Sequence, residues 1–277
     1  MPLIDAHTHV FPEEVIKNRS RIAENDRGFG LLYGQPSSRM ADGDGLRTYL
    51  NKEGISKAIV VGFPFHDPGL LALSNDYLLD LSKGDDRIVP FVMSDLWDEK
   101  RGVGEIERCI EKGARGLGEV AFYSEGFSVE QRKGLDRLVA PLEEANLILM
   151  MHINEQVGHW YSGKARIDFA EMAAFVEAHP RLGIILSHLG GGLCFYEFMP
   201  EFKKAFANVR YDLAAVPFLY NNEVYGFVGS FLREKVLFGS DYPLLPASRY
   251  LPAMRGLEEE VRAKILYGNA EEMLGQT

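Results

Sequence analysis

The sequence has little cysteine: Cys109 and Cys194 are the two thiols in 277 residues. Two thiols cannot form a disulfide framework or a four-thiolate zinc site, and they fit a reducing cytosol. No apolar run approaches the roughly 18 residues of a membrane span. The N-terminal segment MPLIDAHTHV also lacks the cationic start and apolar stretch of a signal peptide. These absences exclude the secreted, membrane and disulfide-rich classes, so we expect a cytoplasmic protein with no membrane partner.

Basic residues are also in the minority, with 30 Lys and Arg against 40 Asp and Glu, for a net charge of −10. A negative surface repels phosphate backbones, so the composition predicts no nucleic-acid partner and leaves a small molecule as the expected substrate. The chain is 46% hydrophobic and 25% charged, as in ordinary soluble globular proteins. Its length suits one α/β barrel, which uses about 250 residues.

What is present is an alternation of short apolar, β-branched runs with amphipathic stretches. The runs are Leu3–Thr8, Lys57–Phe63, Arg87–Met93, Gly113–Val120, Leu147–Ile153, Leu182–His188, Asn208–Leu213 and Lys235–Ser240. The amphipathic stretches include Leu70–Ser82, Glu99–Glu111, Val129–Ala145, Phe169–Ala178 and Glu223–Leu232. Such alternation indicates a parallel sheet with helical crossovers. Eight units without a Gly-rich turn after the first strand favour a closed (β/α)₈ TIM barrel, one domain over residues 1–277, rather than an open sheet.

One connection in this pattern is unusually long. No strand is indicated between Val10 and Leu46, a segment rich in Gly, Arg and Asp. Loops of this length are commonly lids or binding loops, or else disordered. Because it follows the first strand, this loop is expected at the catalytic face of the barrel.

The sharpest local motif is His7-Thr8-His9 at the end of the first strand. Residues two apart on a strand point to the same side, so both imidazoles, with Asp5, are predicted to face the barrel interior. Two neutral nitrogen donors at this spacing suit zinc and similar metals. By itself the motif is weak, since a pair of histidines that faces a helix or lies on the surface has the same spacing.

Four further polar residues are predicted at the ends of other strands: Glu119, His152, His188 and Asp241. Counting back by two places small or apolar residues such as Leu117 and Leu186 on the inward side beneath them. A lone strand histidine is more often a hydrogen-bonded core residue than a ligand. Burying four imidazoles and two carboxylates without a cation would, however, be costly. Together with His7 and His9, these residues predict a metal site.

Two other aspartates and one loop are secondary candidates. Asp5 and Asp212 suit structural hydrogen bonds, although Asp212 could instead orient His188 or contact substrate. The loop after the fifth strand carries His159 near Lys164 and Arg166. These residues could hold an anionic, aromatic group of the substrate. Alternatively the loop is solvated, which we expect for Lys164 and Arg166 but not for His159.

The chain resembles the amidohydrolase superfamily of metal-dependent barrels, and more narrowly its branch that includes the aminocarboxymuconate-semialdehyde decarboxylases. The matching segments extend over nearly the whole chain: IDAHTHV, GLGEV, MHINE, ILSHLGGG, VLFGSDYP and ILYGNAEEML. The resemblance implies that His7, His9, His152 and Asp241 bind a divalent metal. It also implies that His188 binds a second metal or polarises the substrate.

Within this resemblance, the role of Glu119 determines whether the site is expected to hold one metal ion or two. Binuclear members bridge their metals with a glutamate or a carbamylated lysine on the fourth strand, and mononuclear members lack the bridge. Glu119 has the residue type and position for a bridge, whereas Lys112 lies at the wrong end of the strand. The alternative for Glu119 is an acceptor that orients a ligating histidine. Zinc is the expected metal, with manganese, iron and cobalt also compatible.

Three functions follow, in the order in which we expect them. The first is a hydrolase of a small amide, lactone or ester, with Asp241 moving the proton of a metal-activated water and His188 or a second metal polarising the carbonyl. The second is a non-oxidative decarboxylase of a small unsaturated or aromatic acid, favoured by one metal and by an arginine at the pocket. The third is a barrel that binds metal or metabolite without turnover. A homodimer is expected from family habit alone.

Overall fold

The computed structural model describes residues 2–275, and in it eight parallel strands pair in the order β1 to β8. The strands are β1 (Ile4–His9), β2 (Lys57–Val61), β3 (Ile88–Val92), β4 (Gly116–Val120), β5 (Ile148–Met151), β6 (Gly183–Leu186), β7 (Val209–Asp212) and β8 (Val236–Leu237). Each lies within its predicted run or extends one residue beyond it. The predicted (β/α)₈ barrel is therefore confirmed.

The barrel closes where the first strand meets the segment that follows the last. The backbone N–H of Ala6 donates to the carbonyl of Phe238 at 2.8 Å, and that of His9 donates to the carbonyl of Tyr242 at 2.7 Å. Closure leaves no free sheet edge here, and it brings residues about 230 positions apart into contact.

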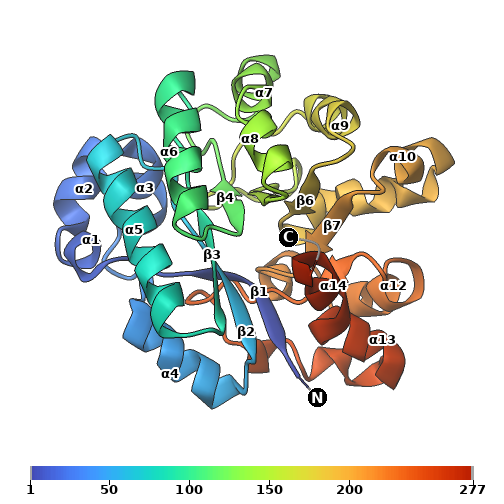
Figure 1. The fold of residues 1–277 in the computed structure, drawn as a ribbon. Helices are drawn as coiled ribbons and strands as arrows, with labels where there is room; N and C mark the ends of the chain where they lie inside the picture. The colour runs from blue at the N-terminus through green and yellow to red at the C-terminus, as the bar shows by residue number, and fades with distance from the viewer. Residues whose placement is uncertain (1, 276–277) are drawn as a thin grey trace.

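Helices surround the strands (Figure 1). They are α1 (Glu13–Lys17), α2 (Arg19–Asn25), α3 (Arg27–Tyr33), α4 (Gly43–Glu53), α5 (Pro68–Gly84), α6 (Glu99–Glu111), α7 (Val129–Asp136), α8 (Val139–Glu144), α9 (Phe169–Ala178), α10 (Pro200–Ala205), α11 (Val216–Leu219), α12 (Glu223–Phe231), α13 (Glu259–Ala263) and α14 (Asn269–Gly275). Aspartates begin several of the helices; for example, Asp67, Asp98 and Asp168 accept hydrogen bonds from N–H groups of the first turns of α5, α6 and α9. Among the described residues, no helix has the length and apolar character needed to cross a membrane.

Two layers of apolar side chains hold the barrel together. The outer layer packs the strands against the helices, while the inner layer includes Ile59, Met150 and Ile185. Met273 and Leu274 of α14 belong to the inner layer and so close the N-terminal end of the barrel. The C-terminal ends of the strands remain as the place for a site.

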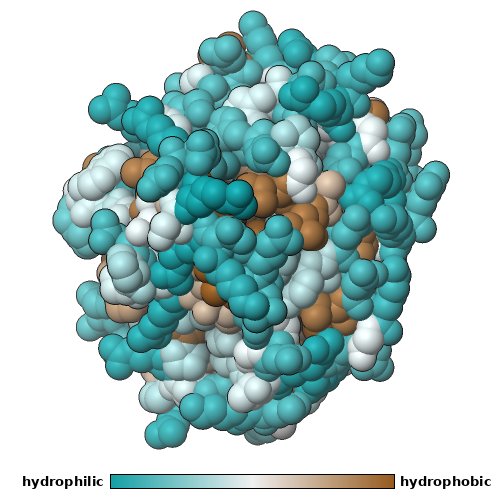
Figure 2. Space-filling model, turned by 90° about the vertical axis from the view of Figure 1, so that its left-hand side faces the viewer, coloured by the Kyte–Doolittle hydropathy of each residue, from teal (hydrophilic) through white to brown (hydrophobic). Residues whose placement is uncertain are grey.

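The expected long loop after β1 is largely helical, which corrects the sequence interpretation. Residues 13–33 form α1, α2 and α3, and α4 follows. Their apolar residues pack inward: Phe11, Phe29 and Tyr33 form a cluster with Phe63 and Phe65, with ring centroids 4.9–6.4 Å apart. The face of the molecule that includes α1 to α3 is mostly hydrophilic (Figure 2). Short helices with few apolar positions leave little periodicity in the sequence.

Candidate metal centre

The six polar residues predicted at strand ends converge at the C-terminal end of the barrel. They form two groups, and within each group the possible ligand atoms lie within 4.8 Å of one another: His7, His9 and Asp241 in the first group, and Glu119, His152 and His188 in the second. All six come from β1 or from the ends of β4, β5, β6 and β8. The structure thus brings all six candidate metal ligands together, and His159 lines a cavity that His152, His188 and Asp241 also line.

The first group has the spacing of a metal site. The Nε2 atoms of His7 and His9 are 3.0 Å apart, and Asp241 Oδ1 lies 3.3 Å from His9 Nε2 and 3.8 Å from His7 Nε2. Ligand atoms bound at about 2.0–2.1 Å in a tetrahedral site lie about 3.3 Å from one another. These three side chains therefore fit one divalent cation.

The second group is similarly compact. His152 Nδ1 lies 3.2 Å from Glu119 Oε1 and 3.2 Å from His188 Nε2. His188 Nε2 lies 3.6 Å from Glu119 Oε1. Two nitrogens and one carboxylate oxygen are again a donor set that suits zinc, manganese or a similar ion.

Backbone carbonyls select the tautomers of the second group. The Nε2–H of His152 donates to the carbonyl of Gly163 at 3.0 Å, so its Nδ1 presents the lone pair to the centre. The Nδ1–H of His188 donates to the carbonyl of Ala214 at 2.8 Å, so its Nε2 presents the lone pair. Metal-ligating histidines are oriented in this way.

Asp212 at the end of β7 orients the first group. Its Oδ2 accepts a hydrogen bond from His7 Nδ1 at 2.7 Å, which leaves His7 Nε2 as the ligand atom. Its Oδ1 accepts from the backbone N–H groups of His188 and Ala214, at 2.8 and 3.0 Å. The sequence analysis expected a structural hydrogen bond from Asp212, or a role in orienting His188. Asp212 does accept from the His188 backbone, and the imidazole that it contacts is that of His7.

Glu119 lies between the two groups. Its Oε2 is 3.6 Å from His7 Nε2 and 3.9 Å from His9 Nε2, while its Oε1 faces His152 and His188. Each of its carboxylate oxygens therefore faces one of the two groups.

The electrostatics of the centre keep both carboxylates charged. Burial favours the neutral acid, but the neighbouring histidines outweigh it and hold the pKa of Glu119 well below its usual value. The same balance lowers the pKa of Asp241 to about 2. Burial acts against the charged form of His7, yet Glu119 and Asp212 raise its pKa well above the ordinary value. The centre therefore favours positive charge between its carboxylates, as a cation site requires.

The alternation of side chains along β1 is not regular, which corrects the prediction for Asp5. Asp5 was expected on the inward side with His7. Instead, it accepts a hydrogen bond of 2.7 Å from the hydroxyl of Tyr49 on α4, in the outer layer. The register of β1 against β2 shifts between Asp5 and Thr8, so the strand changes face before the histidines.

The same correction applies at β4 and β6. Leu117 and Leu186 were expected to point inward, but both belong to the outer layer. Glu119 reaches the interior because the strand is irregular beside it, where Gly118 has φ 151°. His188 reaches it after β6 has ended, with φ 57°.

A cavity of about 250 Å³ lies over the two groups. Its walls include Tyr33, Arg39 and Tyr123, which the sequence analysis missed. Burial and nearby carboxylates raise the pKa values of both tyrosines, so their hydroxyls stay protonated. Tyr33 and Arg39 lie in the segment already expected at the catalytic face, but no motif singled them out.

The segment that carries Arg39 is fixed at both sides. Arg19 on α2 donates to the carbonyls of Gln35, Pro36 and Ser38 at 3.1–3.2 Å. Arg39 itself donates to the carbonyl of Leu244, beyond β8, at 2.8 Å. The segment therefore holds its guanidinium at the edge of the cavity.

His159 lines a second cavity of about 400 Å³ that adjoins the first. Lys164 was expected to be solvated, but it is buried. Its Nζ donates to the carbonyls of Val157 and His159 at 2.6 and 3.1 Å, and it pairs with Glu155 at 3.1 Å. Lys164 therefore holds the loop together through buried contacts, and the loop lines the cavity with His159, Tyr161, Ser162 and Gly163.

The chain belongs to the amidohydrolase family, whose model matches residues 4–276. Members of this family are metal-dependent barrel enzymes, and the two converging groups agree with a divalent metal. No curated protein matches the sequence.

Several solved structures share the fold over the full length of the chain. 5-Carboxyvanillate decarboxylase from Sphingomonas paucimobilis superposes with a TM-score of 0.79 at 16% identity, covering 100% of this chain and 99% of that one. The Novosphingobium aromaticivorans 5-carboxyvanillate decarboxylase, complexed with manganese and 4-hydroxy-3-methoxy-5-nitrobenzoic acid, gives 0.76 at 19%, covering 99% and 96%. 2,6-Dihydroxybenzoate decarboxylase from Rhizobium gives 0.68 at 17%, covering 99% of both chains.

Proposed function

We propose that this protein is a metal-dependent non-oxidative decarboxylase of a small aromatic carboxylic acid with a neighbouring hydroxyl group. This was the second of the functions expected from the sequence. It is supported by the similar solved structures, which include decarboxylases of hydroxylated benzoates. It is carried by one observation in this chain: Arg39 lines the same cavity as the histidines and carboxylates.

Arg39 provides the contact for the substrate's carboxylate. A guanidinium can donate two parallel hydrogen bonds to a carboxylate, and it remains charged at all relevant pH values. Tyr33 and Tyr123 add aromatic walls whose protonated hydroxyls can donate to substrate oxygens. The cavity therefore combines an anion contact with surfaces that suit an aromatic ring.

Asp241 handles the proton. Because its pKa is about 2, it enters the reaction as a carboxylate and can accept the proton of the substrate hydroxyl. It then delivers this proton to the ring carbon that carries the carboxyl group. The ring π electrons, activated by the phenolate oxygen, form the new C–H bond. The electron pair of the breaking C–C bond then restores the aromatic ring as carbon dioxide leaves, and the phenolate takes up a proton from water. A bound divalent cation would hold substrate oxygens and offset their negative charge.

Hydrolysis is the second candidate, and the position of Glu119 favours it. A carboxylate directed at both groups could help to hold two cations, which would lower the pKa of a water molecule for hydrolysis of an amide, lactone or ester. Decarboxylation needs no water nucleophile and is compatible with one cation.

Product analysis separates the two reactions. Metal-loaded protein is incubated with hydroxybenzoates labelled with ¹³C in the carboxyl group, and in parallel with lactones and esters of similar size. We expect ¹³CO₂ with a matching amount of the decarboxylated phenol. Hydrolysis of the lactones or esters without release of ¹³CO₂ from any acid would refute the proposal.

Arg39→Gln tests the anion contact. We expect kcat/KM for the acid to fall by at least tenfold, because one charged hydrogen-bond donor is lost. A variant with unchanged kcat/KM would remove Arg39 from the proposal.

A further inference from the structure

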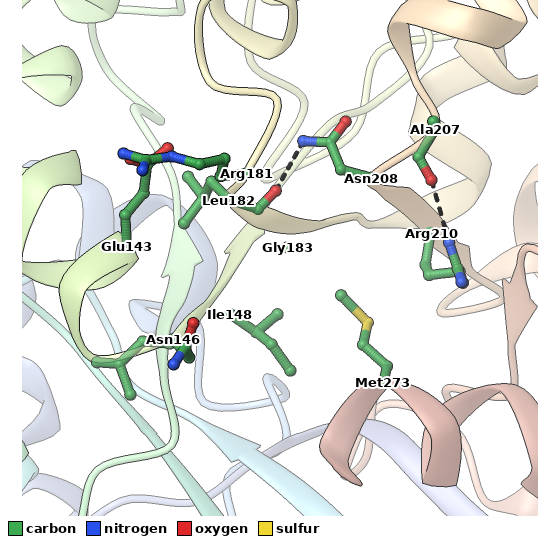
Figure 3. Close-up of a pocket in the computed structure, with 11 residues that line it drawn as sticks. Glu143, Asn146, Ile148, Arg181, Leu182, Gly183, Ala207, Asn208, Arg210 and Met273 are labelled. Atoms are coloured by element: carbon green, nitrogen blue, oxygen red, sulfur yellow. Dashed lines mark hydrogen bonds and ion pairs between the residues drawn. The ribbon is translucent and has the colours of Figure 1, made fainter. Parts of the chain in front are cut away.

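The opposite end of the barrel carries a second set of hollows, at the N-terminal ends of β5 to β8. A hollow of about 320 Å³ extends from Ile148 and Gly183 to Arg210 and Met273 (Figure 3). A wider one of about 850 Å³ shares Ala207 and Arg210 with it. We refer to the two together as the basal groove.

Arg210 lies where the two hollows meet, and its contacts are all long. Its Nη1 donates to the carbonyls of Val209 and Ala207 at 3.3 and 3.5 Å, the latter visible in Figure 3. Its Nη2 lies 3.8 Å from Glu272 Oε1. Its Nε is buried and has no hydrogen-bond partner among residues 2–275.

Other partly buried arginines of this chain are paired closely. Arg87, Arg108 and Arg132 each place a guanidinium nitrogen 2.6–2.7 Å from a carboxylate oxygen. The side chain of Arg210 is 18% exposed, a burial similar to that of Arg132 at 23%. A guanidinium that is buried to this extent without a short contact to an anion destabilises the folded state, because little compensates the loss of its hydration.

Positive charge accumulates around Arg210. Lys203 and Lys235 line the wider hollow with it. Lys235 is paired with Glu197 at 2.6 Å, yet burial together with the charges of Arg210 and Lys203 lowers its pKa. The two hollows have five Lys and Arg side chains against three Glu, in a chain whose net charge is −10. The groove therefore favours an anion.

The wider hollow also has an aromatic wall. Phe198 and Phe231 line it, each 60% exposed, with ring centroids 5.0 Å apart. Exposed aromatic side chains beside a guanidinium suit a ligand with an apolar body and an anionic end.

We propose that the basal groove is a second binding site, for a small aromatic carboxylate, with Arg210 as its anchor. Its guanidinium receives the two oxygens of the ligand's carboxylate, Lys203 adds charge, and Phe198 and Phe231 contact the ring. This site lies at the end of the barrel away from the histidines, so its ligand acts as an effector rather than as the substrate in turnover.

Calorimetric titration of benzoate into the metal-loaded protein tests the proposal. We expect two binding steps in the wild type. Arg210→Gln should weaken one of them at least tenfold, and Arg39→Gln should weaken the other. The matched control is Lys204→Gln, which removes the same charge from an exposed position of α10 outside the groove and should leave both steps unchanged.

Two further measurements test which part of the ligand is recognised and whether the Arg210→Gln variant is folded. Benzyl alcohol has the ring without the charge, and inorganic phosphate has the charge without the ring, so both should bind the Arg210 step at least tenfold more weakly than benzoate. Thermal unfolding of Arg210→Gln should remain cooperative and close to that of the control. A single binding step that Arg210→Gln leaves unchanged, or two steps that Arg210→Gln and Lys204→Gln affect equally, would overturn the proposal, and so would phosphate binding as tightly as benzoate. None of these outcomes bears on the decarboxylase proposal, which ¹³CO₂ release tests.

Discussion

The two groups of the candidate metal centre are held in different ways. The first takes both histidines from β1, and a buried carboxylate, that of Asp212, lies 2.7 Å behind His7. The second takes its three residues from three separate strand ends, and neutral carbonyls fix its histidines. A carboxylate behind an imidazole raises its basicity more than a carbonyl does. The first group should therefore bind its cation more tightly, and the second should depend on Glu119.

Asp241 belongs to the first group, and its substitution should have the largest effect. Asp241→Asn is expected to lower kcat by about 10²–10⁴-fold, because the proton carrier is lost while histidine ligands remain. Turnover is measured as CO₂ release, and metal content by mass spectrometry. Turnover near the wild-type value with the metal fully bound would contradict the role of Asp241.

Asp212→Asn tests the carboxylate behind His7. The amide cannot stabilise charge on the imidazole, so metal affinity of the first group is expected to fall about 10–100-fold. The measurement is a titration of chelator-stripped protein with zinc and with manganese. If the affinity were unchanged, the proposed difference between the groups would have no basis.

Glu119→Gln examines the second group. We expect it to abolish binding of any second equivalent of metal and to leave the first equivalent within a few fold of its wild-type affinity. The same metal titration gives both values. The opposite pattern, in which Glu119→Gln weakens the first equivalent as strongly as Asp212→Asn does, would show that the groups form one inseparable site.

Arg19→Met has the smallest expected effect, since Arg19 touches neither group. It releases the carbonyls that hold the segment of Arg39, so KM should rise a few fold with little change in kcat. The exposed Arg21 of the same helix is the matched position, and Arg21→Met should leave KM unchanged. A fall in kcat with constant KM would argue against a positioning role.

The barrel and the six converging residues could be predicted because their signals are local. Eight apolar runs mark the strands, and polar residues at their ends mark the catalytic face. The way in which Glu119 and His188 reach the interior could not be predicted. Counting by two assumes a regular strand, and the backbone departs from regularity beside both residues.

Other features depend on contacts between distant segments. The pairing of Asp212 with His7 joins residues 205 positions apart, and it gives no pattern in either segment. Arg39 and Tyr123 reach the cavity from segments without a motif, and α1 to α3 are too short for a clear period. The roles of such residues can be assigned only from the tertiary structure.

Closure of the barrel by β1 and the segment that follows β8 has a consequence for synthesis. Asp241 N–H donates to the carbonyl of His7, so the first group is assembled from the beginning and the far end of the chain. A ribosome releases β1 long before the residues after β8, and until then β1 has an unpaired edge. The centre is thus among the last parts of the molecule to form, and chains that end before Asp241 have no first group with which to retain an ion.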